Sequence, residues 1–278
     1  MPPADLPRKP RFVAPAGACD AHCHVFGPQH RFPYAPGQGY YPPPSTRETL
    51  LALHATLGLS RGVIVQGAEY GFDNSIVLDA IAAAPERYRG IAVMDPQASD
   101  AELERLHRGG VRGVRLSLLH GASGDPAAWQ RLAQRVRPLG WHLELHLQPA
   151  DIIRLSAAIA ALPVAVVIDH IARVPAAAGL AQPAFQALLE VVRRDNGWVK
   201  ISGLERITAP PYEAVIPLAR ALLAAAPARV VWGSDFPHPK LDYRPDDAAL
   251  LDLIPLFAPD AADRQRLLVD NPARLYDF

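Results

Sequence analysis

Cysteine is nearly absent from this sequence of 278 residues, which contains only Cys19 and Cys23. On one extended strand their Cα atoms would lie about 13 Å apart, at about 3.3 Å per residue. A disulfide spans no more than roughly 7 Å, so we expect the two residues not to be bridged. Reduced thiols are typical of the cytoplasm, which is the predicted location.

Long hydrophobic segments are missing as well. The longest apolar run, 159–168, contains Pro163 and ends at Asp169. It is well short of the roughly 18–20 residues that span a bilayer. The N-terminus is rich in proline and has no apolar core typical of a signal peptide. We therefore expect no membrane association.

Neither sign of charge is in excess, because 28 Lys and Arg residues balance 28 Asp and Glu residues. A balanced chain argues against the broad basic surface that binds nucleic acid or anionic lipid. We expect a small molecule as the partner, no nucleic acid and no membrane. A homo-oligomer is compatible with this composition.

The pattern that is present alternates short β-branched runs with longer stretches rich in Ala and Leu, in a chain that is 50% apolar. Such alternation indicates parallel strands joined by helices. An open doubly wound sheet would show it too, but eight strands with polar ends favour a closed barrel, a fold of roughly 250 residues. The expected strands are Ala18–His24, Gly62–Gln66, Arg89–Met94, Gly113–Leu118, His142–Leu147, Val164–Asp169, Val199–Ser202 and Val230–Gly233. The expected helices are Thr46–Leu57, Asn74–Ala84, Asp100–Arg108, Pro126–Leu139, Asp151–Ala161, Pro183–Arg194, Glu213–Ala225 and Asp260–Val269.

We predict one α/β domain over residues 1–278, a distorted (β/α)8 TIM barrel with a proline-rich N-terminal extension at 1–16. Two segments depart from the repeat. Gly27–Ser45, rich in Pro, Gly and Tyr, predicts a long loop after the first strand. Asp246–Phe257 predicts an extra helix after the eighth strand. Ser99 with Glu102 is a capping box, and Asp125 before Pro126 is a second helix start.

Polar residues mark the carboxyl ends of the expected strands, where the catalytic groups of such barrels lie. Solvated strand ends would show Ser, Asn, Gly and Lys, whereas four histidines stand here. The residues are His22, His24, Gln66, Asp95, Arg115, Ser117, His146, His170, Ser202, Arg206 and Asp235.

The segment His22-Cys23-His24 carries the strongest signal. Strand alternation predicts that Asp20, His22 and His24 point into the barrel. The intervening residues would face the helices: Cys19, Ala21 and Cys23. Two imidazoles at the open end can bind a metal or polarise a carbonyl.

Other strand ends suggest a base and anion-binding groups. Asp235 can act as a general base for water or can cap a helix. His170 can bind a substrate oxygen or be a satisfied buried histidine. Arg115 and Arg206 suit a carboxylate clamp or a structural ion pair, and Tyr40, in the long loop, can close over a ligand.

Seven motifs resemble the amidohydrolase superfamily, and within it the branch of 2-pyrone-4,6-dicarboxylate hydrolases (lactonases). The similarity runs from Gly17 to Tyr276. The motifs are ACDAHCHVFGP at 18–28, GVIVQ at 62–66, RGIAVMDP at 89–96, GGVRGVR at 109–115, VIDH at 167–170, WGSDFPHP at 232–239 and NPARLY at 271–276.

This resemblance implies a hydrolase of aromatic catabolism that opens the ring ester of a small carboxylated lactone without a required metal. His22, His24 and His170 would polarise the carbonyl, and Asp235 would activate the water. The implied substrate-binding residues are Arg115, Arg206, Tyr40, His146, Ser117 and His238.

The chain departs from the branch at three places. His146 stands where the branch has tyrosine, a second arginine after Arg115 is missing, and Ala68 replaces a serine. The first departure completes a set that could bind a single Zn²⁺: His22, His24, His146 and Asp235. Glu144 shares the inward face with His146 and would either orient a histidine or pair with an arginine.

Three alternatives to the lactonase hypothesis follow. One is a zinc-dependent amidohydrolase or decarboxylase acting on another small acid. A second is a sugar-acid lactonase or isomerase. The third is a barrel that binds a small acid without catalysis, which would not need a positioned base such as Asp235.

Overall fold

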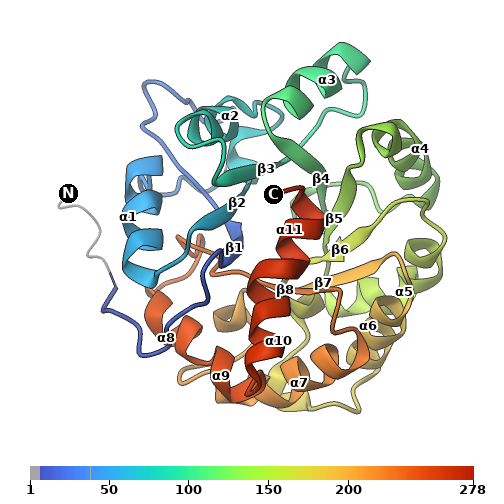
Figure 1. Cartoon of the computed structure of the whole chain (residues 1–278). Helices are drawn as coiled ribbons and strands as arrows, with labels where there is room; N and C mark the ends of the chain where they lie inside the picture. The colour runs from blue at the N-terminus through green and yellow to red at the C-terminus, as the bar shows by residue number, and fades with distance from the viewer. Residues whose placement is uncertain (1–6, 38) are drawn as a thin grey trace.

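The computed structural model describes residues 7–37 and 39–278, so residues 1–6 of the expected N-terminal extension lie outside the described residues. Eight parallel strands follow one another in chain order around a barrel (Figure 1). This confirms the predicted (β/α)8 architecture. The strands are β1 Cys19–Cys23, β2 Arg61–Val65, β3 Tyr88–Ala92, β4 Val111–Ser117, β5 His142–His146, β6 Val166–Ile168, β7 Gly197–Ile201 and β8 Val230–Trp232.

The seam of the barrel lies between β8 and β1. The backbone N–H of Asp235 donates to the carbonyl of His22 at 2.8 Å, and that of His24 donates to the carbonyl of Phe236 at 2.7 Å. Gly233 permits this approach, because a Cβ there would lie 2.6 Å from the backbone N of His22. Closure of the barrel therefore brings His22, on the first strand, and Asp235, after the last strand, into one site.

Helices surround the strands (Figure 1). They are α1 Arg47–Leu57, α2 Ser75–Ala82, α3 Asp100–Arg108, α4 Pro126–Val136, α5 Pro149–Ala160, α6 Pro183–Arg193, α7 Ile216–Ala225, α8 Asp247–Asp252, α9 Ile254–Phe257, α10 Ala261–Gln265 and α11 Asn271–Tyr276. Within the described ranges, none of them is long and apolar enough to cross a membrane.

The helix predictions hold with local differences. The extra helix after β8 is present as two short helices, α8 and α9. The predicted helix 260–269 is α10 followed by a π-helical turn over Arg266–Asp270. Asp125 caps α4 by accepting from the N–H groups of Ala127 and Ala128. Ser99 caps α3, but the Glu102 carboxylate pairs with Arg105 instead of completing a capping box.

The first strand corrects the expected alternation. Its pairing with β2 shifts register between Asp20 and Cys23, which marks a β-bulge. Asp20 therefore points outward to His54 of α1, at 3.3 Å, rather than into the barrel. Cys19 and Ala21 face inward, among the interior residues of other strands. The prediction holds for His22, which lies within the shifted stretch, for His24, which follows it, and for Cys23, which faces the helices. Both cysteines are free thiols.

A first group of interior side chains, called here the apolar interior cluster, fills the barrel at its closed end. Its members are Cys19, Ala21, Val63, Val65, Ile91, Val167, Trp198, Val231 and Tyr276. Tyr276 comes from α11, which crosses the end of the barrel in Figure 1. Asp277, which follows Tyr276, fastens that end, because its carbonyl accepts hydrogen bonds from Arg89 at the start of β3. The other end of the barrel is thus left for the site.

Candidate active site

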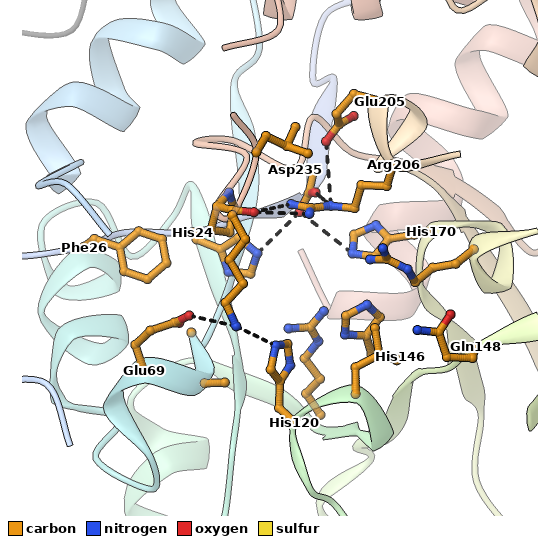
Figure 2. A pocket seen from close by; sticks show the side chains of 18 residues that line it. His24, Phe26, Glu69, His120, His146, Gln148, His170, Glu205, Arg206 and Asp235 are labelled. Carbon is orange, nitrogen blue, oxygen red and sulfur yellow. Dashed lines mark hydrogen bonds and ion pairs between the residues drawn. The ribbon is translucent and has the colours of Figure 1, made fainter. Parts of the chain in front are cut away.

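A cavity of about 480 Å³ opens at the carboxyl ends of the strands. Figure 2 shows Asp235 and Arg206 at one end of it and His120 at the other, with His146 and His170 along one side. The lining residues that bear charge or an imidazole are His24, Glu69, Arg115, His120, His146, His170, Arg173, Glu205, Arg206, Asp235 and Lys240.

Asp235 is the centre of three imidazoles. Its Oδ1 lies 3.5 Å from Nε2 of His24, 3.6 Å from Nε2 of His22 and 3.8 Å from Nε2 of His170. All four side chains are buried. Asp235 has a φ of 66°, a left-handed conformation that is strained for a residue with a Cβ. Such backbone conformations cluster at functional sites, and here the residue that adopts one carries the carboxyl group that meets the three imidazoles.

Arg206 holds the other oxygen of this carboxylate. Its Nε donates to Asp235 Oδ2 at 2.5 Å, and its two terminal nitrogens donate to the carbonyl of Pro239 at 3.2 Å. Burial opposes ionisation of Asp235, but Arg206 and the nearby imidazoles keep the pKa of Asp235 well below its usual range. The candidate base is therefore ionised at neutral pH.

A second group of interior side chains lies between the apolar interior cluster and the cavity. This polar interior cluster comprises His22, Arg115, Glu144, Asp169 and Lys200. Lys200 Nζ donates to Glu144 Oε2 at 2.5 Å and lies 3.1 Å from His22 Nδ1. Glu144 thus pairs chiefly with a lysine that the sequence did not indicate, while the expected kinds of partner, His22 and Arg115, lie 3.7 and 3.8 Å from its Oε1.

His24 and His170 are each held by one ring nitrogen. Nδ1 of His24 lies 2.8 Å from the carbonyl oxygen of Val65, which can only accept, so this nitrogen carries a proton. Nδ1 of His170 contacts Ser202 Oγ at 2.9 Å. Burial lowers the pKa of His170 to about 3, so its imidazole is neutral.

The backbone that carries His170 is unusual. Four successive residues from His170 to Arg173 have φ values of 51–54°. Residues with a Cβ adopt this left-handed region rarely. Gly203 makes room for the ring, since a Cβ there would lie 2.6 Å from His170 Nδ1. The turn places two side chains, His170 and Arg173, in the same cavity.

His146 lies on the cavity wall away from Asp235. Its Nδ1 contacts Ser117 Oγ at 3.0 Å, and Ser117 also contacts His120 Nδ1 at 2.8 Å. Ser117 does not line the cavity itself and instead orients these two rings. At the rim, Lys240 lies 2.9 Å from His120 Nε2 and 3.6 Å from Glu69 (Figure 2).

The two predicted clamp arginines have carboxylate partners within the protein. Arg115 Nε donates to Asp169 Oδ2 at 2.9 Å, while the residue still lines the cavity. Arg206 is directed at Asp235. By contrast, no salt bridge or hydrogen bond to a described residue involves the guanidinium of Arg173, which is also in the cavity. Arg173 is therefore the arginine most open to an anionic ligand.

Two further predicted residues lie outside the cavity wall. His238 is buried between Glu205 and Asp247, 3.0 Å from each. Although burial opposes its charge, these carboxylates raise the pKa of His238 to about 10. The ring is thus a structural cation. Tyr40 lies beside the rim, where its ring is 5.8 Å from Lys240 Nζ.

Sequence reasoning missed several residues of the site. Lys200 could have been found, because a lysine in the middle of an apolar strand must have a buried partner. Asp169 directly precedes His170 in a motif that was singled out for the histidine alone. Arg173, Lys240 and Glu205 lie on irregular segments after strands, where no periodic pattern indicates the direction of a side chain.

The donor atoms of the site are close enough for a metal ion. His22, His170 and Asp235 offer ligand atoms within 4.8 Å of one another, and His24 Nε2 lies beside them. Among the described residues, His146 is not part of this group; its ring packs against that of His170, with the two centroids 5.2 Å apart. The hydrogen bonding of His22 opposes the fit: a ligating imidazole donates its second N–H to an acceptor, whereas Lys200 is a donor.

Comparison with known proteins agrees with this arrangement. The family model described as Amidohydrolase matches residues 19–278. The chain belongs to the amidohydrolase family. This amidohydrolase is 42% identical to a 2-pyrone-4,6-dicarboxylate hydrolase of Comamonas testosteroni, over 97% of this chain and 93% of the relative. It is 41% identical to a 4-sulfomuconolactone hydrolase of Rhizobium radiobacter, over 99% and 96%.

Solved structures extend the likeness of this amidohydrolase. A Pseudomonas putida protein described as a candidate 2-pyrone-4,6-dicarboxylic acid hydrolase is 34% identical, with a TM-score of 0.81, over 94% of this chain and 97% of that one. A Burkholderia multivorans amidohydrolase solved with bound zinc is 21% identical, with a TM-score of 0.76, over 95% and 100%. The second likeness shows the fold alone.

Proposed function

We propose that this amidohydrolase is a lactonase that opens the ring ester of a small carboxylated lactone resembling 2-pyrone-4,6-dicarboxylate. The observation that carries the proposal is the buried carboxyl group of Asp235, with three imidazole nitrogens within 3.8 Å of Oδ1 and Arg206 on Oδ2. Such a group suits the activation of water beside a polarised carbonyl. The names of the two relatives that are more than 40% identical support the substrate class.

In the proposed first step, Asp235 takes a proton from water while the water oxygen bonds to the lactone carbonyl carbon. The carbonyl π electrons move to its oxygen, and His22 and His170 donate hydrogen bonds to the resulting oxyanion. His24 has a different part, because its Nδ1 proton is donated to Val65. In the tautomer with this proton on Nδ1, Nε2 is an acceptor, so we assign it to holding the attacking water.

In the second step the oxyanion re-forms the carbonyl, and the bond between this carbon and the ring oxygen breaks. The carboxylic acid of Asp235 returns its proton to the departing ring oxygen. The products are one new carboxylic acid and one enol or alcohol on an opened chain. No metal is needed to balance either step, and we propose that none is required.

Cations in the cavity support an anionic substrate. We propose that Arg173 and Lys240 bind its acidic groups, together with the terminal nitrogens of Arg115, while His146 contacts the ring. Arg206 is assigned to Asp235, since its three nitrogens are directed at that carboxylate and at Pro239. Tyr40 covers the rim beside Lys240.

A sulfonated lactone is the second candidate substrate. The 4-sulfomuconolactone hydrolase of Rhizobium radiobacter is nearly as similar as the dicarboxylate hydrolase. A guanidinium and an ammonium can also pair with the negative charge of a sulfonate. Three expectations from the sequence stay predictions: the location in the cytoplasm, the single domain over 1–278 and the oligomeric state.

The deciding experiment is hydrolysis of 2-pyrone-4,6-dicarboxylate and 4-sulfomuconolactone by purified protein, before and after exhaustive chelation. The expected result is turnover of the dicarboxylate that survives chelation and is lost in Asp235→Asn protein prepared in parallel. Turnover of the sulfonate alone would select the second candidate. Activity that disappears with chelator and returns with zinc would replace the metal-free mechanism, and failure of both lactones would contradict the proposal.

A further inference from the structure

The two histidines of the first strand have opposite hydrogen-bond partners at Nδ1. His24 faces the Val65 carbonyl, an acceptor, at 2.8 Å. His22 faces the Lys200 ammonium at 3.1 Å. An ammonium has three donors and no acceptor, so His22 Nδ1 must supply the lone pair. In a neutral His22 the proton is then on Nε2.

The surroundings of Lys200 support its role as a donor. The side chain is fully buried on β7. Its Nζ lies 2.5 Å from Glu144 Oε2, 3.1 Å from His22 Nδ1 and 3.6 Å from Asp169 Oδ1. Three acceptors thus surround a group with three N–H bonds. Lys200 therefore contacts His22 and both carboxylates of the polar interior cluster.

Asp169 competes for the same ring nitrogen. Its Oδ1 lies 3.2 Å from His22 Nδ1 and would favour the opposite tautomer. The contact lacks hydrogen-bond geometry, however, and Asp169 Oδ1 has no hydrogen-bond partner among the described residues. The orientation of the ring therefore favours Lys200.

The opposite face of the ring looks toward the reaction. His22 Nε2 is buried, lies 3.6 Å from Asp235 Oδ1 and has no hydrogen-bond partner within the described part of the chain. The Lys200 ammonium, 3.1 Å from Nδ1, disfavours a second positive charge on this ring. Its tautomer then decides whether Nε2 offers a proton or a lone pair to the cavity.

We propose that Lys200 is a positioning residue that holds His22 with its proton on Nε2. In this tautomer His22 donates a hydrogen bond to the lactone carbonyl and cannot ligate a divalent cation through Nε2. The carbonyl contact rests on the proposed function, whereas the tautomer and the exclusion of the cation do not. A resident metal at His22 would require the contrary arrangement, with Nδ1–H donating to Asp169.

The test is ¹⁵N NMR of the imidazoles, with His22 assigned by its loss in His22→Gln protein. Wild-type protein should show a protonated Nε2 and an unprotonated Nδ1. Lys200→Met, which keeps the length of the side chain but removes the donor, should move the proton to Nδ1. The double variant Lys200→Met/Glu144→Gln removes the pair of charges together and gives the same readout if the single variant does not fold.

Two further readouts separate positioning from simple packing. Zinc affinity, measured by competition with a chromogenic chelator, should rise about 10-fold or more in Lys200→Met, and kcat should fall about 10- to 100-fold with a smaller change in KM. Lys240→Met is the matched control, because it removes a lysine from His120 instead. This control should leave the His22 signals and the zinc affinity unchanged.

A wild-type His22 with its proton on Nδ1 would overturn the inference, as would a tautomer that Lys200→Met leaves unaltered. These outcomes are distinct from failure of the proposed function. If the NMR and zinc results are as expected and neither lactone is hydrolysed, Lys200 still sets the tautomer, and the substrate assignment is the part that fails.

Discussion

The inside of this barrel consists of two clusters with opposite chemistry. The apolar interior cluster packs aliphatic and aromatic side chains beneath the site, closed by Tyr276. The polar interior cluster places two cations, two carboxylates and His22 in an equally buried layer above it. The first cluster gains free energy from burial alone. The second is stable only while every charge keeps its partner. The residues that chiefly stabilise the fold and those next to the reacting groups therefore lie at different levels along the barrel axis.

The backbone also differs between the strands that carry the apolar interior cluster and the segments at the open end of the barrel. The strands that carry the apolar interior cluster are regular apart from register shifts in the pairings of β1 with β2 and of β3 with β4. The segments at the open end contain left-handed residues, including Asp235 at 66° and Arg173 at 54°. Strained backbone persists where surrounding structure enforces it and where it aims a functional side chain. The contrast can be tested by changes at the two ends of the barrel.

The largest effect is expected for Asp235→Asn. Loss of the base should lower kcat by about 10³- to 10⁴-fold, while the protein stays folded by circular dichroism and binds the substrate. The measurement is steady-state kinetics on the lactone that the wild-type protein hydrolyses. Asp242→Asn, an exposed carboxylate on the segment after β8, is the control and should be fully active. Unchanged turnover in Asp235→Asn would remove the base from the mechanism.

A change in the apolar interior cluster should show the opposite behaviour. Ile91→Ala, at a fully buried position of β3, should lower the free energy of unfolding by about 2–5 kcal/mol. Ile91→Val should lower it by about 0.5–1.5 kcal/mol. Denaturant titration measures both, and kcat at 25 °C should remain that of wild type. A large loss of kcat in folded Ile91→Val protein would show that the two clusters are coupled.

Removal of the Arg173 guanidinium, which has no partner among the described residues, should affect substrate binding more than the chemical step. Arg173→Met should raise KM about 10- to 100-fold with a smaller change in kcat, because a charged hydrogen bond to the substrate is lost. Arg131→Met, on the exposed surface of α4, should change neither constant. An unaltered KM in Arg173→Met would assign the anion-binding role to the other cations of the cavity.

The smallest effect concerns pH. Ionised Asp235 is the active form, and Arg206 keeps its pKa low, so activity should persist as the pH falls toward the ordinary range of an aspartic acid. Arg206→Gln removes the neighbouring cation and should raise this pKa. The acid limb of log kcat/KM should then move to higher pH by the same amount. A limb that does not move would mean that another group limits activity in acid.

Much of the fold was accessible from the sequence. Alternating runs of β-branched and helix-forming residues predict the eight strands in order, and polar residues at strand ends predict His22, His24, His170 and Asp235 in one place. The periodic pattern could not show the bulge in β1, because an extra residue shifts the inward face without changing the composition. Asp20 was misplaced for this reason.

The partners of buried charges were the other part that sequence could not supply. Arg206 was expected to contact the substrate, and the structure directs it at Asp235. His238 was expected in the site, and it joins Glu205 to Asp247 instead. A titratable residue at a strand end indicates a functional region, but which carboxylate meets which cation depends on contacts between segments that are far apart in the chain.

Gly203 has a consequence for attempts to change the substrate range by directed evolution. Any side chain at position 203 would collide with the ring of His170. We therefore expect every variant with a substitution at this position to lose activity, whatever substrate is offered. Tyr40 and Lys240 border the same cavity without supporting an imidazole that faces Asp235. Diversity is best introduced at these rim positions, where a new ligand can be accommodated while the reacting groups keep their places.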